Sequence, residues 1–140
     1  MTKRSKPVML TENFALDEFR CGCGCDGHRQ PEIRARLLQL CERRLEPIRA
    51  AIGGVGLTIY TGYRCQTYND RCGGAKRSQH LLGAAADLTA KRASVSQIGM
   101  AARAVMAELD DTGGVKEYHR KDRVSFCHVD DRVGRWDGNR

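Results

Sequence analysis

The stretch SQHLLGAAAD, at 78–87, places a histidine and an aspartate seven positions apart with a glycine between them. On one helix face these two residues would be roughly 10 Å apart along the axis, too far to share an ion. A two-residue turn at Gly83 and Ala84 would instead pair two strands. His80 would then lie directly opposite Asp87, with about 5 Å between their Cβ atoms. The spacing therefore predicts a β-hairpin that carries either a metal site or a buried histidine hydrogen-bonded to a carboxylate.

Two longer stretches have the apolar spacing of helices. From Pro31 onward, apolar residues recur at three- and four-residue steps, which is the pattern of an amphipathic helix. Pro31 suits a first helical turn, Pro47 predicts a kink, and the glycines at 53–54 predict the end of the helix. Ser94 is a suitable cap for a second long helix, which we expect to stop at the glycines 113–114.

The other regular segments alternate in the manner of strands. GLTIYTGYR, at 56–64, predicts a strand, and two further strands are expected over about 115–119 and 124–130. A short helix is expected over 65–72. Because the chain has no internal repeat and no low-complexity linker, residues 1–140 are expected to form a single domain. The predicted fold class is α+β, with helices packed on a small antiparallel sheet.

A further candidate ligand lies in the last predicted strand, VSFCHVDD. Side chains alternate along a strand, so Phe126, His128 and Asp130 are expected on one face. His128 could then join the two residues of the predicted hairpin. Two imidazoles, one carboxylate and an open fourth position make a catalytic zinc site, which suits amide hydrolysis. The candidate ligands are His80, Asp87 and His128.

The composition limits the possible partners. No apolar run approaches the roughly 18 residues of a membrane span, so we expect no membrane insertion. The formal net charge of +7 favours an anionic partner, but the positive residues are spread along the chain without a basic helix. No specific nucleic-acid binding is therefore expected. The N-terminus has no recognisable apolar signal segment, so we expect a protein made in the cytoplasm. We also expect it to be a monomer.

The chain has seven cysteines, an odd number, so a complete set of internal disulfides is impossible. Three of them alternate with glycines in CGCGC, at 21–25, and His28 follows closely. With His28 close by, this segment could form a small structural zinc knot, completed by Cys65. It lacks the C-x-x-C spacing typical of such sites. A glycine-rich turn with reduced or partly bridged thiols is the alternative.

Several of these motifs occur together in one known family. GYRCQTYNDRCGGAKRSQHLLGAAADL followed by FCHVD closely resembles the zinc D-alanyl-D-alanine carboxypeptidase-like murein peptidases, relatives of the lysostaphin-type peptidases and of the hedgehog domain. NFALDEFRCGCGC and GRWDG resemble the opening and close of that domain in its short form, often encoded by phages or prophages. The resemblance covers nearly the whole chain, and its motif S-x-H-x-x-G-x-A-x-D is specific.

The resemblance implies zinc-dependent hydrolysis of peptide bonds in the stem or cross-bridge peptides of peptidoglycan. The enzyme would be a D-Ala-type carboxypeptidase or an endopeptidase, and a phage endolysin is one form that it could take. By this resemblance, His80, Asp87 and His128 match the zinc ligands of the family. Arg64 matches the substrate-facing arginine of G-Y-R, where a guanidinium can hold a carboxylate or an oxyanion. Ser78 matches the serine of S-x-H. A structural salt bridge at Arg64 and a simple turn residue at Ser78 are the alternatives.

The sequence departs from better-known members at the general base. Those members carry an acidic residue three positions before the last histidine ligand, where this chain has Ser125. Serine does not act as a base at neutral pH. Asp130 is our first replacement, since strand parity aims it to the side of His128, and Asp122 and Glu117 are the alternatives. Asp130 has a second possible role, which is to orient His128.

Two other classes of function stay open from the sequence. A catalytically inactive module for wall binding or signalling could keep the zinc site for stability alone. A nucleic-acid-binding zinc protein would instead hold its metal on Cys21, Cys23 and Cys25. From the resemblance we expect an enzyme that acts on the cell wall. The sequence does not indicate the route by which it would be exported.

Overall fold

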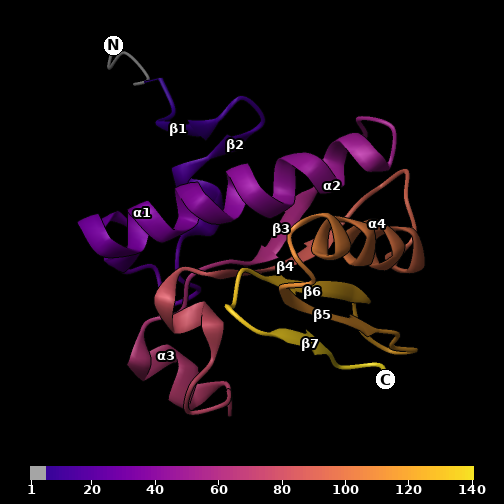
Figure 1. The fold of residues 1–140 in the computed structure, drawn as a ribbon. Coiled ribbons are helices and arrows are strands. Elements are labelled where there is room, and N and C mark those ends of the chain that lie inside the picture. Colours follow the sequence, from indigo (N-terminus) through magenta and orange to yellow (C-terminus); the bar gives the residue numbers. More distant parts are fainter. Residues whose placement is uncertain (1–5) are drawn as a thin grey trace.

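A five-stranded sheet forms the centre of this computed structural model, which describes residues 6–140; residues 1–5 of the predicted domain lie outside the described part. Its strands run in the order β3-β4-β6-β5-β7 (Figure 1), and neighbours are antiparallel except β5 and β7. The predicted α+β class is confirmed, whereas the parallel edge strand was not predicted. The strands are β3 (Thr58–Thr61), β4 (Ala85–Thr89), β5 (Gly113–Tyr118), β6 (Phe126–Asp130) and β7 (Arg135–Asp137).

The first predicted helix is built from three connected parts. They are α1 (Pro31–Leu40), a π-helical turn (Cys41–Leu45) and α2 (Glu46–Ala51). Pro47 has no N–H to donate, and its ring clashes with the carbonyl four residues earlier in a regular α-helix. The wider π turn lies directly before α2, where it accommodates the proline. Gly53 and Gly54 follow the helix, as predicted, with φ angles of +90° and +74° that favour glycine.

The second predicted helix is α4 (Val95–Glu108), and Ser94 caps it. Ser94 Oγ accepts the Gln97 N–H at 3.1 Å, and the Gln97 side chain accepts the Ser94 N–H at 2.7 Å, which is a capping box. The helix does not continue to Gly113, so that predicted end was wrong. Gly113 instead opens β5 with φ +103°, and the Arg44 guanidinium packs where its Cβ would lie.

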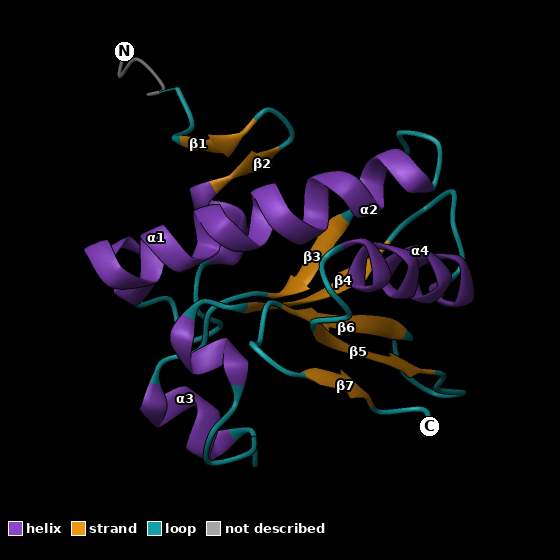
Figure 2. Ribbon diagram, viewed as in Figure 1, coloured by secondary structure: helices purple, strands orange, loops and turns teal. Residues whose placement is uncertain are grey.

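Short elements complete the fold around the sheet. In Figure 2, the two-stranded sheet of β1 and β2 is separate from the main sheet. The helix α3 lies below α1, apart from the strands of the main sheet. Within the described residues, no helix has the length and apolar character needed to cross a membrane. The short elements are β1 (Met9–Thr11), β2 (Phe14–Ala15), α3 (Gln66–Arg71), predicted as a short helix, and the 3-10 helices Leu16–Phe19, Gly27–Arg29 and Gln79–Leu82.

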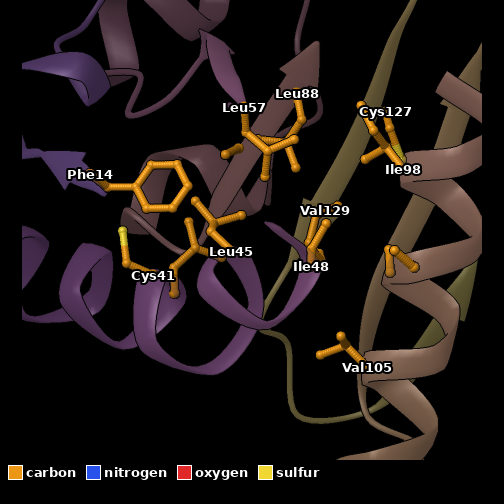
Figure 3. Packing of buried hydrophobic residues seen from close by; sticks show 14 of the residues in the cluster. Phe14, Cys41, Leu45, Ile48, Leu57, Leu88, Ile98, Val105, Cys127 and Val129 are labelled. Atoms are coloured by element: carbon orange, nitrogen blue, oxygen red, sulfur yellow. The ribbon is translucent and has the colours of Figure 1, made fainter. Parts of the chain in front are cut away.

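The hydrophobic core lies between the helices and one face of the sheet (Figure 3). Leu88, Cys127 and Val129 point into it from β4 and β6, and all three are almost fully buried. Because side chains alternate along a strand, Asp87 and His128 point to the opposite face. The helices are therefore used to bury the apolar face, and the other face is left available for polar groups.

Candidate metal centre

The segment 79–84 does not form the predicted hairpin. Gln79–Leu82 is a 3-10 helix, with Ser78 Oγ accepting the His80 N–H at 3.2 Å, and Gly83 follows in the left-handed conformation at φ +72°. A serine cap before a short helix and a glycine after it explain this outcome. Asp87 pairs across the sheet with His128 of β6, not with His80. The predicted hairpin pairing of His80 with Asp87 was therefore wrong, although the side chains of His80, Asp87 and His128 do lie close together.

The side chains of His80, Asp87 and His128 converge on one point. Asp87 Oδ1 lies 3.3 Å from His80 Nε2 and 3.0 Å from His128 Nδ1. One donor atom from each residue lies within 4.8 Å of the other two. His80 and Asp87 are buried, and His128 is largely buried. Two nitrogens and one oxygen thus surround a single position, which is the donor set of an open zinc site.

The outer nitrogen of each imidazole is held in place. His80 Nδ1 lies 2.7 Å from the Gly62 carbonyl oxygen, which can only accept, so Nδ1 carries the hydrogen. His128 Nε2 lies 2.8 Å from Asp130 Oδ2. Nε2 of His80 and Nδ1 of His128 are therefore the nitrogens that face Asp87. Metal-binding histidines are usually oriented in this way by a carbonyl or a carboxylate on the far nitrogen.

The electrostatics of the three side chains favour a carboxylate next to imidazoles. Burial would raise the pKa of Asp87, but hydrogen bonds from His128 and His80 outweigh burial and hold the pKa well below its usual range. Burial would lower the pKa of His128, but hydrogen bonds to Asp130 and Asp87 raise it to about 9. Zinc would therefore have to displace a proton from His128 in order to bind at neutral pH.

Asp130 is fully buried behind His128 and does not line the cleft. Its carboxylate also accepts hydrogen bonds from the Arg132 side chain, at 2.8 Å from Nε and 2.7 Å from Nη2. Both carboxylate oxygens are thus occupied. This position fits the orienting role and leaves no free oxygen directed at the cleft for a general base.

The two alternative acids also lie away from the ligands. Glu117 points toward α4 and pairs with Arg103 and His119. Asp122 is exposed and does not line the cleft. Ser125, at the position of the missing acid, closes its own loop, because its hydroxyl accepts the Arg120 N–H at 2.9 Å. Asp87 is the one carboxylate along the cleft among residues 6–140.

Arg64 and Ser78 both lie along the cleft, close to His80. The Arg64 N–H donates to the His80 carbonyl at 3.1 Å, and within the described chain no carboxylate is ion-paired with the Arg64 guanidinium. The salt-bridge alternative for Arg64 thus finds no partner there. Ser78 makes the contact of a helix cap, which matches its structural alternative.

An open cleft of 1060 Å³ leads to the three candidate ligands. Its walls combine guanidinium groups with aromatic rings. Tyr60 and Tyr118 stack on the Phe126 ring, with centroid separations of 5.4 and 4.6 Å. The cleft suits an anionic, partly apolar ligand, since the described lining holds five arginines against a single acid. These arginines are Arg64, Arg77, Arg120, Arg123 and Arg132.

Trp136 is a cleft residue that the sequence analysis missed. The centroid of its ring lies 5.8 Å from the centroid of the His128 ring. The guanidinium carbon of Arg132 lies over the same ring, 4.6 Å from its centroid. Trp136 belongs to β7, the parallel edge strand that was not predicted. Its only signal in the sequence was the motif GRWDG near the end of the chain.

Comparison with known proteins identifies the family of the chain. The model of the family Peptidase M15 matches residues 10–130. Over 93 residues, the chain is 34% identical to the zinc D-Ala-D-Ala carboxypeptidase of Streptomyces albus G. The match covers 65% of this chain, but the chain spans only 36% of the length of that relative. The resemblance found in the sequence motifs is confirmed: the chain belongs to the peptidase M15 family.

Proposed function

We propose that the protein is a zinc-dependent peptidase that hydrolyses a peptide bond in peptidoglycan, with His80, Asp87 and His128 as the zinc ligands. The observation that carries this proposal is the convergence of two imidazole nitrogens and a carboxylate oxygen at the floor of an open cleft. The family and the zinc carboxypeptidase relative support both the metal and the class of reaction. Zinc, when bound, lowers the pKa of a water ligand and polarises a carbonyl.

Each proposed role follows from the contacts of these residues. Asp87 stays ionised because both imidazoles hydrogen-bond to it, so it contributes the negative charge of the ligand set. The Gly62 carbonyl and Asp130 fix the two rings, so that His80 Nε2 and His128 Nδ1 are presented together. Arg64, which lacks an ion-pair partner among the described residues, binds a substrate carboxylate or the developing oxyanion.

The charge of the cleft supports the proposed substrate class. Peptidoglycan stem peptides carry several carboxylates, and the arginines of the lining suit them. Aromatic rings beside these arginines can contact the small apolar side chains of alanine residues. The cell wall is therefore the proposed place of action, with an endolysin of the phage type as the finer hypothesis and D-Ala-adjacent bonds as the proposed target.

A second candidate function is a catalytically inactive, zinc-stabilised module for wall binding or signalling. It is favoured by one observation: Asp87, itself a proposed ligand, is the one acid along the cleft in the described structure. A hydrolytic site needs a group that accepts a proton from the attacking water. The module would keep the metal and the cationic cleft, and it would bind stem peptides without cleaving them.

Digestion of defined muropeptides, followed by mass spectrometry of the products, tests the proposal. Loss of a terminal alanine identifies a carboxypeptidase, and cleavage inside a cross-link identifies an endopeptidase. Asp87→Ala should abolish turnover and reduce bound zinc. Arg64→Lys should lose most turnover with zinc retained, because a lysine does not reproduce the bidentate guanidinium. Arg36→Lys, on the exposed surface of α1, is the matched control. Binding of muropeptides with no product would favour the module.

A further inference from the structure

Four cysteine side chains gather at one place, away from the three candidate ligands described above. Cys21 Sγ lies 3.5 Å from Cys23 Sγ and 3.7 Å from Cys65 Sγ, and Cys23 Sγ lies 3.7 Å from Cys65 Sγ. Cys25 joins them, so that all four sulfur atoms lie within 4.8 Å of one another. None of the four forms a disulfide. This arrangement places four potential thiolate ligands around a single point.

The sulfur separations match the dimensions of a zinc tetrahedron. A Zn–S bond is about 2.3 Å, so the edge of a regular ZnS₄ tetrahedron is roughly 3.8 Å. The sulfur atoms of Cys21, Cys23 and Cys65 lie 3.5–3.7 Å apart in pairs. A disulfide needs a sulfur separation of about 2.05 Å, so every one of these pairs would have to move to form one. The observed spacing is closer to that of a metal site.

The glycines of CGCGC allow three cysteines so close in sequence to face one point. Gly24 has φ +86°, and its N–H donates to the Cys21 carbonyl at 2.9 Å, which turns the chain back. Gly22 packs against Tyr68, and a Cβ at that position would collide with the Tyr68 hydroxyl. The Cys65 N–H points at Cys21 Sγ from 3.4 Å, which is a contact that stabilises a thiolate.

We propose that Cys21, Cys23, Cys25 and Cys65 bind a second zinc ion. Four protein ligands leave no open position for water or substrate, so this zinc is structural and not catalytic. His28, which the sequence analysis considered as a ligand, is excluded by its position. It does not belong to the group of side chains that gather around this point, and its Nε2 lies 2.7 Å from Asp17 Oδ1. The alternative, a glycine-rich turn with reduced or partly bridged thiols, would leave these four sulfur atoms without a metal.

The proposed ion would join the N-terminal arm to the segment 62–65. The Tyr63 N–H already donates to the Phe19 carbonyl at 2.9 Å, so the two parts lie side by side. Within this segment, Gly62 holds the His80 ring and Arg64 donates to the His80 backbone. A zinc ion on Cys65 would thus restrain the residues next to the candidate metal centre. The site itself does not depend on the proposed peptidase activity.

Metal content of the purified, zinc-loaded full chain tests the proposal. Elemental analysis should find two zinc ions per chain in the unmodified protein. Cys65→Ser and Cys23→Ser should each hold one, and so should Asp87→Ala, which removes the other site. Cys72→Ser is the matched control, because Cys72 is exposed and outside the cluster, and it should keep two.

X-ray absorption at the zinc edge of Asp87→Ala separates the outcomes even if the cysteine variants fail to fold. The remaining zinc should show a shell of sulfur neighbours only, at about 2.3 Å. A shell of nitrogen and oxygen, or the absence of zinc, would overturn the cysteine site. So would disulfides among these four cysteines, found by mass spectrometry of protein purified under reducing conditions. Failure of the muropeptide assay would leave the sulfur shell unchanged.

Discussion

Replacing Asp130 by asparagine should weaken zinc binding without removing a proton-transfer step. The buried carboxylate accepts a hydrogen bond from His128 Nε2 at 2.8 Å, and it is held by Arg132. Asparagine keeps the shape but removes the charge, and a hydrogen bond to a charged group contributes about 1.5–3 kcal/mol. At about 1.4 kcal/mol per tenfold change, its loss lowers the intrinsic zinc affinity by about 10- to 140-fold.

The same change also alters the competition between zinc and a proton at His128. Burial lowers the pKa of His128, and hydrogen bonds to Asp130 and Asp87 more than reverse this effect, so the pKa is about 9. Removing the charge of Asp130 lowers this pKa and makes proton competition weaker at neutral pH. The two effects of the substitution therefore oppose each other below pH 9. Well above that pH, His128 is mostly unprotonated in both proteins, so the loss of intrinsic zinc affinity is no longer masked.

Competition with a chromogenic chelator, at neutral pH and again above pH 9, measures zinc affinity in both proteins. The deficit of Asp130→Asn should be larger at the higher pH, and kcat at saturating zinc should change by less than about tenfold. Unchanged affinity with a kcat loss of about 10²- to 10⁴-fold would refute the orienting role and identify Asp130 as the base. Asp122→Asn, on the exposed loop, is the control and should leave both quantities unchanged.

Three further predictions concern Arg64, Cys23 and Arg103. Arg64→Lys should lower kcat/KM strongly with an unchanged melting temperature, and equal kinetics for Arg64→Lys and Arg36→Lys would make Arg64 merely structural. Cys23→Ser should lower the melting temperature more than the specific activity of the folded fraction, and normal stability without activity would contradict this. Arg103→Met should destabilise the fold by about 1–2 kcal/mol in urea unfolding, because Arg103 pairs with largely buried Asp137. The hydrogen bond from Arg103 lowers the pKa of Asp137, so this contribution exists above the unfolded pKa and is lost as pH falls; an unchanged acid transition in Arg103→Met would argue against it.

The parts of the fold that follow from local pattern could be predicted from the sequence. The helix from Pro31 has a strong apolar period, and Ser94 supplies an unambiguous cap. Parity along 124–130 correctly separated His128 from Cys127, because alternation is a property of any strand. The approach of His128 to Asp87 follows from that parity once the two strands are neighbours.

The parts that depend on contacts between distant segments could not be predicted. The sequence around Gly83 suits either a hairpin turn or a short helix with a glycine after it, and packing against Ile33 and Leu37 accompanies the second. β7 has only three residues, too few for a pattern, and its pairing with β5 defines it. The sequence offered Cys65 as a partner of the CGCGC turn, but the alternative of a turn without it stayed open, because tertiary contacts between segments far apart in sequence decide that position.

The location of the candidate ligands on different kinds of elements has a consequence for metal exchange. Asp87 and His128 sit on β4 and β6, which have a paired strand on each side, and amide hydrogens in such strands exchange slowly with solvent. His80 instead sits on a 3-10 helix of four residues, and such short helices have weaker backbone hydrogen bonds than a paired strand. Release of the ion should therefore proceed through local opening of 79–82. Hydrogen–deuterium exchange should show that zinc slows exchange at these amides far more than in the two central strands.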